Sequence, residues 1–164
     1  MEKSMEAIMT PALALFDRFR VLANRAGEWV GLLGIRLLLG YEFGMFSGLS
    51  KLNGENWFAE IKGDFPFPFN VVSVEFSWFL ATWSEILGGI ALAIGLATRF
   101  FSITLLIFTG VAWAAVHAGN GYNVCSNGYT LPLMFMIMLI PLILNGPGKL
   151  SIDYFLLKRS GKNV

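Results

Sequence analysis

The chain has 164 residues, of which 55% are hydrophobic and 14% are charged, and its formal net charge is +1. A soluble domain carries about 25% charged residues, so this composition excludes an ordinary soluble fold and, with a mean hydropathy of +0.63, favours an integral protein of the lipid bilayer. The balanced charge leaves no basic patch for nucleic acid, and one cysteine and one histidine exclude an internal disulfide and a thiolate or histidine-rich metal site.

The N-terminal segment, residues 1–28, mixes acidic, basic and apolar side chains and lacks the apolar core and cleavage site of a signal peptide. Its apolar residues between Met5 and Leu22 recur mostly at spacings of three and four. This pattern predicts an amphipathic helix that either lies in the membrane interface or packs on the rest of the protein as a short lead-in.

Four apolar stretches follow, at residues 29–50, 78–97, 100–118 and 129–145. The second and third are joined so tightly that their helices must be antiparallel neighbours. Pro132 and Pro141 fall near the two ends of the fourth stretch, where a proline disturbs a helix least. We therefore predict an all-α fold, an antiparallel four-helix transmembrane bundle over residues 29–157, preceded by the N-terminal interfacial amphipathic helix and followed by a basic cytoplasmic tail at 158–164.

Two polar loops, residues 51–77 and 119–128, lie on one side of this predicted bundle. The longer loop contains the run Phe-Pro-Phe-Pro-Phe at 65–69, which resists helix and strand and forms either an ordered aromatic cap or a gate for a ligand. Lys and Arg concentrate on the side of the two termini, whereas these loops hold only Lys51 and Lys62. The positive-inside rule predicts a multi-pass protein of the cell inner membrane with cytoplasmic termini and outward-facing loops.

Ionisable side chains interrupt three of the apolar stretches, where each is costly in hydrocarbon and needs a reason to be there: Arg36, Glu42, Glu85 and His117. Helix rise places Glu42 and Glu85 both about 20 Å from the basic side, with His117 a little beyond them. All three are candidates for catalytic proton handling, since a carboxyl group in an apolar site and an imidazole can exchange protons near neutral pH. The alternatives are that Glu42 snorkels to the interface beside Lys51 and that His117 is a histidine at a helix end.

Small residues form rows on the first two predicted spans. Gly40, Gly44 and Gly48 follow Arg36 at intervals of four, and Gly88 and Gly89 follow Glu85 on the second span. Such rows let two membrane helices approach closely, so we expect these spans to pack against each other. Arg36 and Glu85 are then expected to form a buried structural pair, either as a lock on helix register or beside a proton-handling site.

Cys125 lies in the shorter outward loop and has no second cysteine near it. It is either an inert loop residue or, with Lys51 near the same surface, a contact for a partner. The chain as a whole is expected to form a homo-oligomer or to join a protein partner of a redox or metal-handling system.

Three motifs resemble the DoxX family of small four-helix membrane proteins. They are Arg36-x3-Gly40-x7-Gly48-x2-Lys51 on the first span, the stretch from Glu85 through Gly88-Gly89 to Arg99, and Gly146-Pro-Gly-Lys-Leu-Ser-Ile-Asp153 after the fourth span. Together they cover residues 30–155. The segments 53–58 and 123–132 and the Phe-Pro run resemble more narrowly the HvfX-type subgroup, which is encoded beside enzymes that make copper-responsive modified peptides.

The resemblance implies a membrane component of a redox or stress-response system, similar to the quinone-linked oxidoreductase subunits of the DoxX family. The alternative is a non-catalytic membrane scaffold or partner in a copper- or metal-handling modified-peptide pathway, and a small transporter is a third interpretation. The sequence contains no dinucleotide glycine fingerprint, haem ligand pair or iron–sulfur cysteines, so no intrinsic cofactor is expected. A quinone near Glu42, Glu85 and His117 is the cofactor that the resemblance implies.

Overall fold

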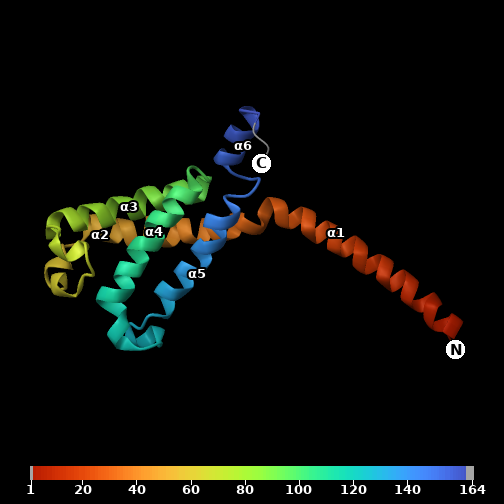
Figure 1. The fold of residues 1–164 in the computed structure, drawn as a ribbon, viewed down its shortest axis with the longest axis horizontal. Helices are drawn as coiled ribbons and strands as arrows, with labels where there is room; N and C mark the ends of the chain where they lie inside the picture. The colour runs from red at the N-terminus through yellow and green to blue at the C-terminus, as the bar shows by residue number, and fades with distance from the viewer. Residues whose placement is uncertain (1, 162–164) are drawn as a thin grey trace.

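The computed structural model of the protein describes residues 2–161, with side chains from residue 13 onward. Throughout this part the chain is helical, without a strand, which confirms the all-α prediction. The main helices are α1 (Glu2–Gly40), α2 (Leu49–Asn53), α3 (Val74–Ile94), α4 (Thr98–Ala112), α5 (Thr130–Asn145) and α6 (Ile152–Arg159). Figure 1 shows α3, α4 and α5 gathered beside the second half of α1.

Two segments of π-helix extend these helices. Tyr41–Gly48 joins α1 to α2 without a break, and Trp113–His117 continues α4. Three continuous helical stretches are thereby long and apolar enough to cross a membrane: Leu13–Asn53, Val74–Ile94 and Thr98–Asn120. The fourth crossing, α5, is a shorter apolar helix of 16 residues with Pro141 inside it. The predicted four-helix transmembrane bundle is confirmed, and the chain is a multi-pass membrane protein.

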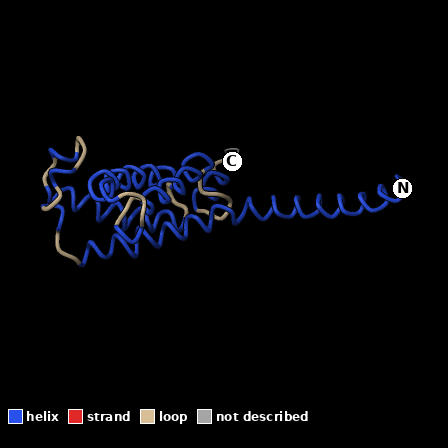
Figure 2. The backbone as a smooth tube through the Cα atoms, turned by 90° about the horizontal axis from the view of Figure 1, so that it is seen from below, coloured by secondary structure: helices blue, strands red, loops and turns tan. Residues whose placement is uncertain are grey.

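The first crossing differs from the prediction because it has no boundary near Trp29. α1 runs unbroken from the N-terminal segment into the bundle, and Figures 1 and 2 show its first half projecting away from the other helices. Residues 13–31 are exposed along this projection. The idea of a lead-in packed on the bundle is therefore wrong for residues 13–27, whereas Glu28 contacts Lys149; the placement of this segment in a membrane interface stays a prediction. The side chains before Leu13 lie outside the described part.

Glycines allow the first crossing to pack closely on α3, as predicted. A Cβ atom added at Gly40 would lie 2.8 Å from the carbonyl oxygen of Gly89, and one added at Gly48 would lie 2.6 Å from the Cγ1 of Ile86. Gly88 faces α4 instead, where an added Cβ would lie 3.1 Å from Leu105. Neighbouring helices in lipid gain stability from such close contact, because hydrophobic burial drives them together only weakly there.

The core of the bundle is built from leucines that all four crossings contribute. Leu39, Leu92, Leu105, Leu139 and Leu142 are fully buried. On the outer surface of the crossings the large exposed side chains are apolar as well, as contact with acyl chains requires, and they include Phe79, Leu87, Ile90, Ile103, Ile107 and Ile137.

One end of the bundle is closed by the segment that leads into α6. The carboxylate of Asp153 accepts hydrogen bonds from the backbone N–H groups of Ala97 (2.7 Å) and Thr98 (2.8 Å), at the start of α4. A carboxylate there satisfies N–H groups that have no partner within the helix. The predicted tail at 158–164 begins inside α6, because Lys158 and Arg159 form its last turn, whereas Lys162 lies outside the described residues.

The long loop at the other end is ordered as an aromatic cap. Phe58 packs edge-on against Phe65 and Trp78, with ring centroids 5.2 and 5.0 Å apart, and Phe65 is 6% exposed. Short 3-10 turns at Trp57–Ala59, Lys62–Asp64 and Phe69–Val71 hold the backbone between these rings. The loop is thus a cap, as one of the two interpretations proposed, and its role as a gate stays a prediction.

Candidate functional site

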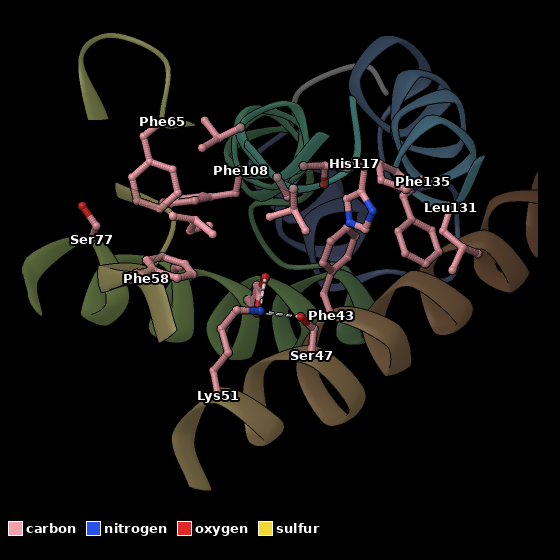
Figure 3. A pocket seen from close by; sticks show the side chains of 18 of the residues that line it. Phe43, Ser47, Lys51, Phe58, Phe65, Ser77, Phe108, His117, Leu131 and Phe135 are labelled. Atoms are coloured by element: carbon pink, nitrogen blue, oxygen red, sulfur yellow. Dashed lines mark hydrogen bonds and ion pairs between the residues drawn. The ribbon is translucent and has the colours of Figure 1, made fainter. Parts of the chain in front are cut away.

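A cavity of about 300 Å³ lies beneath the aromatic cap, between the crossings. Its walls are mainly aromatic and aliphatic, and its polar groups come from the first three crossings. Figure 3 shows the rings of Phe43, Phe58, Phe65, Phe108 and Phe135 around it. The polar side chains that line the cavity are Glu42, Ser47, Lys51, Ser77, Glu85, Thr109 and His117. A small apolar cavity with a few convergent polar groups is the usual form of a ligand site.

Lys51 and Glu85 form the charged pair of this cavity. The Lys51 Nζ atom lies 2.7 and 3.0 Å from the two carboxylate oxygens of Glu85, and their side chains are 14% and 12% exposed. Ser47 joins them, because its hydroxyl accepts a hydrogen bond from Lys51 (2.7 Å) and donates one to Glu85 (2.9 Å). We call these three residues the Lys51 network, and Figure 3 shows the Lys51 and Ser47 side of it.

The helix geometry explains why these three residues meet. Ser47 and Lys51 are four residues apart and therefore lie on one face of the first crossing, one turn above the other. The glycine contacts bring Gly48 against Ile86 on the antiparallel α3, and Glu85 is the neighbour of Ile86. Full pairing offsets much of the cost of removing two charges from water, whereas loss of one partner would leave the other charge buried alone.

The predicted Arg36–Glu85 pair is wrong, because the register of the two helices separates the residues. Glu85 lies level with Gly48, so Arg36 is roughly 18 Å away along the axis of the first crossing. Glu85 pairs with Lys51 instead. The broader expectation, that polar groups of the first two crossings meet inside the protein, is confirmed by the Lys51 network.

Arg36 has a structural partner at the opposite end of the bundle. Its side chain is fully buried and donates a hydrogen bond from Nη2 to the backbone carbonyl of Leu150. Gly95, with φ of +72°, lies so close that an added Cβ would overlap the guanidinium and the Ser151 side chain. The backbone N–H of Asp153 donates to the carbonyl of Gly95 (2.9 Å). We call this arrangement of Arg36, Gly95, Leu150 and Asp153 the Arg36 contact, and it joins the first crossing to the start of α6.

Glu42 and His117, the other two predicted proton-handling residues, both line the cavity. The side chain of Glu42 is partly buried on the π-helical segment of the first crossing. The Nδ1 atom of His117 lies 2.8 Å from the carbonyl oxygen of Asn127. The structure therefore gathers Glu42, Glu85 and His117 around one cavity, and their role in proton handling stays a prediction.

Both π-helical segments of the described chain pass along this cavity. Tyr41–Gly48 contributes Glu42, Phe43, Phe46 and Ser47, and Trp113–His117 contributes Val116 and His117. A π-helical turn inserts extra backbone into a helix and turns side chains away from their regular positions, and such turns occur often at functional sites. Their coincidence at one cavity supports its identification as the functional site.

Sequence reasoning missed Ser47 and Ser77 in the wall of the cavity. Ser47 could have been found from its spacing of four residues before Lys51. Ser77 gave no such signal, since a serine at the start of an apolar stretch is common; its hydroxyl is buried and has no hydrogen-bond partner among the described residues.

Cys125 lies outside this cavity. Cys125 is a free, exposed thiol on the loop between α4 and α5, and it does not line the cavity. Its contact with a partner stays a prediction. Within the described part of the chain, no three His, Cys, Asp or Glu side chains are grouped closely enough to hold a metal ion.

The sequence is similar to that of a known family of membrane proteins. The sequence model of the DoxX family matches residues 31–118, which contain the part of the first crossing from residue 31 onward, the whole second crossing and most of the third. A protein of Haemophilus influenzae, named only as an uncharacterized protein, is 48% identical over 132 residues, 80% of this chain and 87% of that protein. No solved structure matches the chain.

Proposed function

The chain belongs to the DoxX family of membrane proteins, and from that premise we propose that its aromatic cavity binds the ring of a quinone within a membrane redox or stress-response system. The single observation that carries the proposal is the Lys51 network, a charged and nearly enclosed group set in the wall of an otherwise apolar cavity. Buried ionisable groups in membrane proteins commonly mark the path of a substrate, ion or proton.

The residues present fit a quinone ring in size and chemistry. A cavity of about 300 Å³ is at the small end of ligand sites, which suits a single substituted ring with its tail outside. The aromatic walls favour a flat ring, because faces and edges of aromatic rings attract each other. A quinone oxygen accepts hydrogen bonds. The Lys51 ammonium donates its three N–H groups to the Ser47 hydroxyl and to both carboxylate oxygens of Glu85, so a quinone oxygen would take the place of the longer contact of 3.0 Å to Glu85.

Within this proposal each residue has a role of its own. Lys51 binds and orients a ligand oxygen, Glu85 and Ser47 hold the ammonium in place, and Glu42 and His117 exchange protons with the ligand. A bound quinone supplies two-electron, two-proton redox chemistry, and a protein partner provides the electrons. The aromatic cap keeps water away from the ring, and Phe58 and Phe65 are the residues of the cap that face the cavity.

We propose further that the protein lies in the cell inner membrane with both termini in the cytoplasm. The proposal is supported by the concentration of Lys and Arg at the end of the bundle where the termini lie, opposite to the end with the aromatic cap. Cys125, the single and exposed cysteine, gives a direct test. A membrane-impermeant maleimide should label it in intact spheroplasts, and labelling only after lysis would show the opposite orientation.

The quinone proposal is tested by measuring quinone that remains with the protein after mild detergent extraction. Lys51→Met should lower quinone retention about tenfold or more, since a hydrogen bond to a charged group contributes about 1.5–3 kcal/mol. Lys62→Met is the matched control, because Lys62 is an exposed lysine of the same loop region that does not line the cavity. A wild-type protein that neither retains quinone nor binds an added short-chain quinone would refute the proposal and favour the scaffold alternative.

A further inference from the structure

The orientation of His117 is determined by a carbonyl group, and this has a consequence for the ligand. The Nδ1 atom lies 2.8 Å from the carbonyl oxygen of Asn127. A carbonyl oxygen can only accept a hydrogen bond, so Nδ1 must carry the hydrogen, and in a neutral imidazole Nε2 is then left as an acceptor. We propose that His117 presents Nε2 to the cavity as a hydrogen-bond acceptor, and that the cavity therefore selects a ring with a hydroxyl group, a hydroquinone or phenol.

The loop between α4 and α5 holds the Asn127 carbonyl in position. The side-chain amide of Asn120 donates to this same oxygen (3.3 Å) and to the carbonyl of Val116 (3.1 Å). The loop also closes on itself through backbone hydrogen bonds from Gly128 to Asn123 (2.8 Å) and from Tyr129 to Gly121 (2.9 Å). Asn120 is therefore a positioning residue, which acts on the ligand only through Asn127 and His117.

Asn127 itself adopts a conformation that few side chains tolerate. Its φ is +56°, in the left-handed region, where asparagine is the residue most often found after glycine. This backbone angle turns the carbonyl of Asn127 back toward α4, where both His117 and Asn120 reach it. The residue that supplies the acceptor for His117 thus has an uncommon backbone conformation.

The two sides of the cavity are consequently complementary to an unsymmetrical ligand. Lys51 offers an N–H donor in place of its 3.0 Å contact with Glu85, and His117 offers an acceptor from another crossing. Figure 3 shows the two side chains entering the cavity from different helices. A ring that carries one oxygen acceptor and one hydroxyl donor satisfies both, whereas a fully oxidised dione leaves Nε2 without a donor. This inference rests on the proposed function and specifies which form of the ring the cavity prefers.

The orientation is testable without any ligand, because the chain contains a single histidine. In the neutral form of the imidazole, protein labelled with 15N-histidine should show a protonated Nδ1 and an unprotonated Nε2. Asn120→Ala should weaken this preference and give a mixture of tautomers. Asn53→Ala is the matched control, because Asn53 also donates to a carbonyl four residues earlier, Leu49 (2.9 Å), and does not line the cavity. A wild-type spectrum of the Nε2–H tautomer would overturn the proposal.

The preference for a hydroxyl group is tested with a water-soluble hydroquinone and its dimethyl ether, which has nearly the same shape. The wild type should bind the hydroquinone about tenfold more tightly, and His117→Phe should remove this difference while the ether binds as before. Equal affinity of the wild type for both would overturn the choice of ligand. If neither ring nor an oxidised short-chain quinone binds although the tautomer is as expected, the proposed function fails while the orientation of His117 stands.

Discussion

The two ends of the bundle each hold charged side chains that are buried or partly buried, but these side chains form different kinds of bond. At the Arg36 contact the guanidinium and the Asp153 carboxylate are bonded to backbone groups of distant segments, Leu150 in one case and Ala97 and Thr98 in the other. In the Lys51 network the charges are bonded to each other's side chains and face a cavity.

This comparison separates closure of the fold from a binding site. A charge that bonds to backbone across the chain ties segments together and leaves no room for a ligand, as the crowding around Gly95 shows. The side-chain pair of the Lys51 network lines a cavity with aromatic walls, so a molecule that enters can exchange with one of its hydrogen bonds. We therefore expect substitutions at the Arg36 contact to change stability, and substitutions at the Lys51 network to change binding as well.

The largest effect is expected from breaking the Lys51 network. Glu85→Leu should destabilise the protein by about 3 kcal/mol, because it leaves the ammonium of Lys51 buried without its partner. Lys51→Met combined with Glu85→Leu should recover much of this loss, since no unpaired charge remains. Unfolding of the three variants in detergent, followed by circular dichroism, checks this prediction. A double variant as unstable as the sum of the two single variants would mean that the pair has little coupling.

A smaller loss is expected at Gly95 in the Arg36 contact. Gly95→Ala should cost about 2 kcal/mol, because the residue has φ of +72° and its Cβ would overlap the Arg36 guanidinium. Gly110→Ala is the matched control, since nothing lies within 4 Å of its added Cβ and alanine favours a helix. Quinone retention by a folded Gly95→Ala protein should match the wild type. Loss of binding at unchanged stability would contradict the separation of the two ends.

The next effect in size concerns Asp153. Asp153→Ala should lower stability by about 1 kcal/mol, because the backbone N–H groups of Ala97 and Thr98 lose their acceptor at the start of α4. Hydrogen exchange at these two amides should become faster, and Asp64→Ala in the exposed loop should leave it unchanged. Unaltered exchange in Asp153→Ala would show that the carboxylate does not cap α4.

The smallest effect is expected from the ion pair between Lys149 and Glu28, at the same end as the Arg36 contact. The hydrogen bond to Glu28 raises the pKa of Lys149, so any stability that the pair contributes is complete below the ordinary lysine pKa of about 10.4 and is lost as the pH rises through the raised value. The pair is exposed to solvent. At each pH from 6 to 9, Lys149→Met should therefore have the same unfolding midpoint as the wild type within error. A clearly lower unfolding midpoint of Lys149→Met in this range would show that the ion pair contributes to stability, as the Arg36 contact does.

Much of the fold was predictable because membrane helices must satisfy their own backbone and face lipid with apolar side chains. The four crossings, the antiparallel turn at 97–99 and the glycine contact between the first two crossings all followed from that requirement. The grouping of Glu42, Glu85 and His117 at one level followed from helix rise alone. The continuity of α1 through residue 29 was not predictable, because a change in composition alters the environment of a helix without interrupting its hydrogen bonds.

The sequence by itself determined that this protein is a helical membrane bundle of the DoxX family with ionisable groups inside it. Only the tertiary structure decided which of those groups are partners. The choice of Lys51 over Arg36 for Glu85 depends on the register of two antiparallel helices, and a shift of a few residues would reverse it. That register is set by close glycine contacts and by the anchoring of Arg36 to Leu150, which lies more than a hundred residues away in the chain.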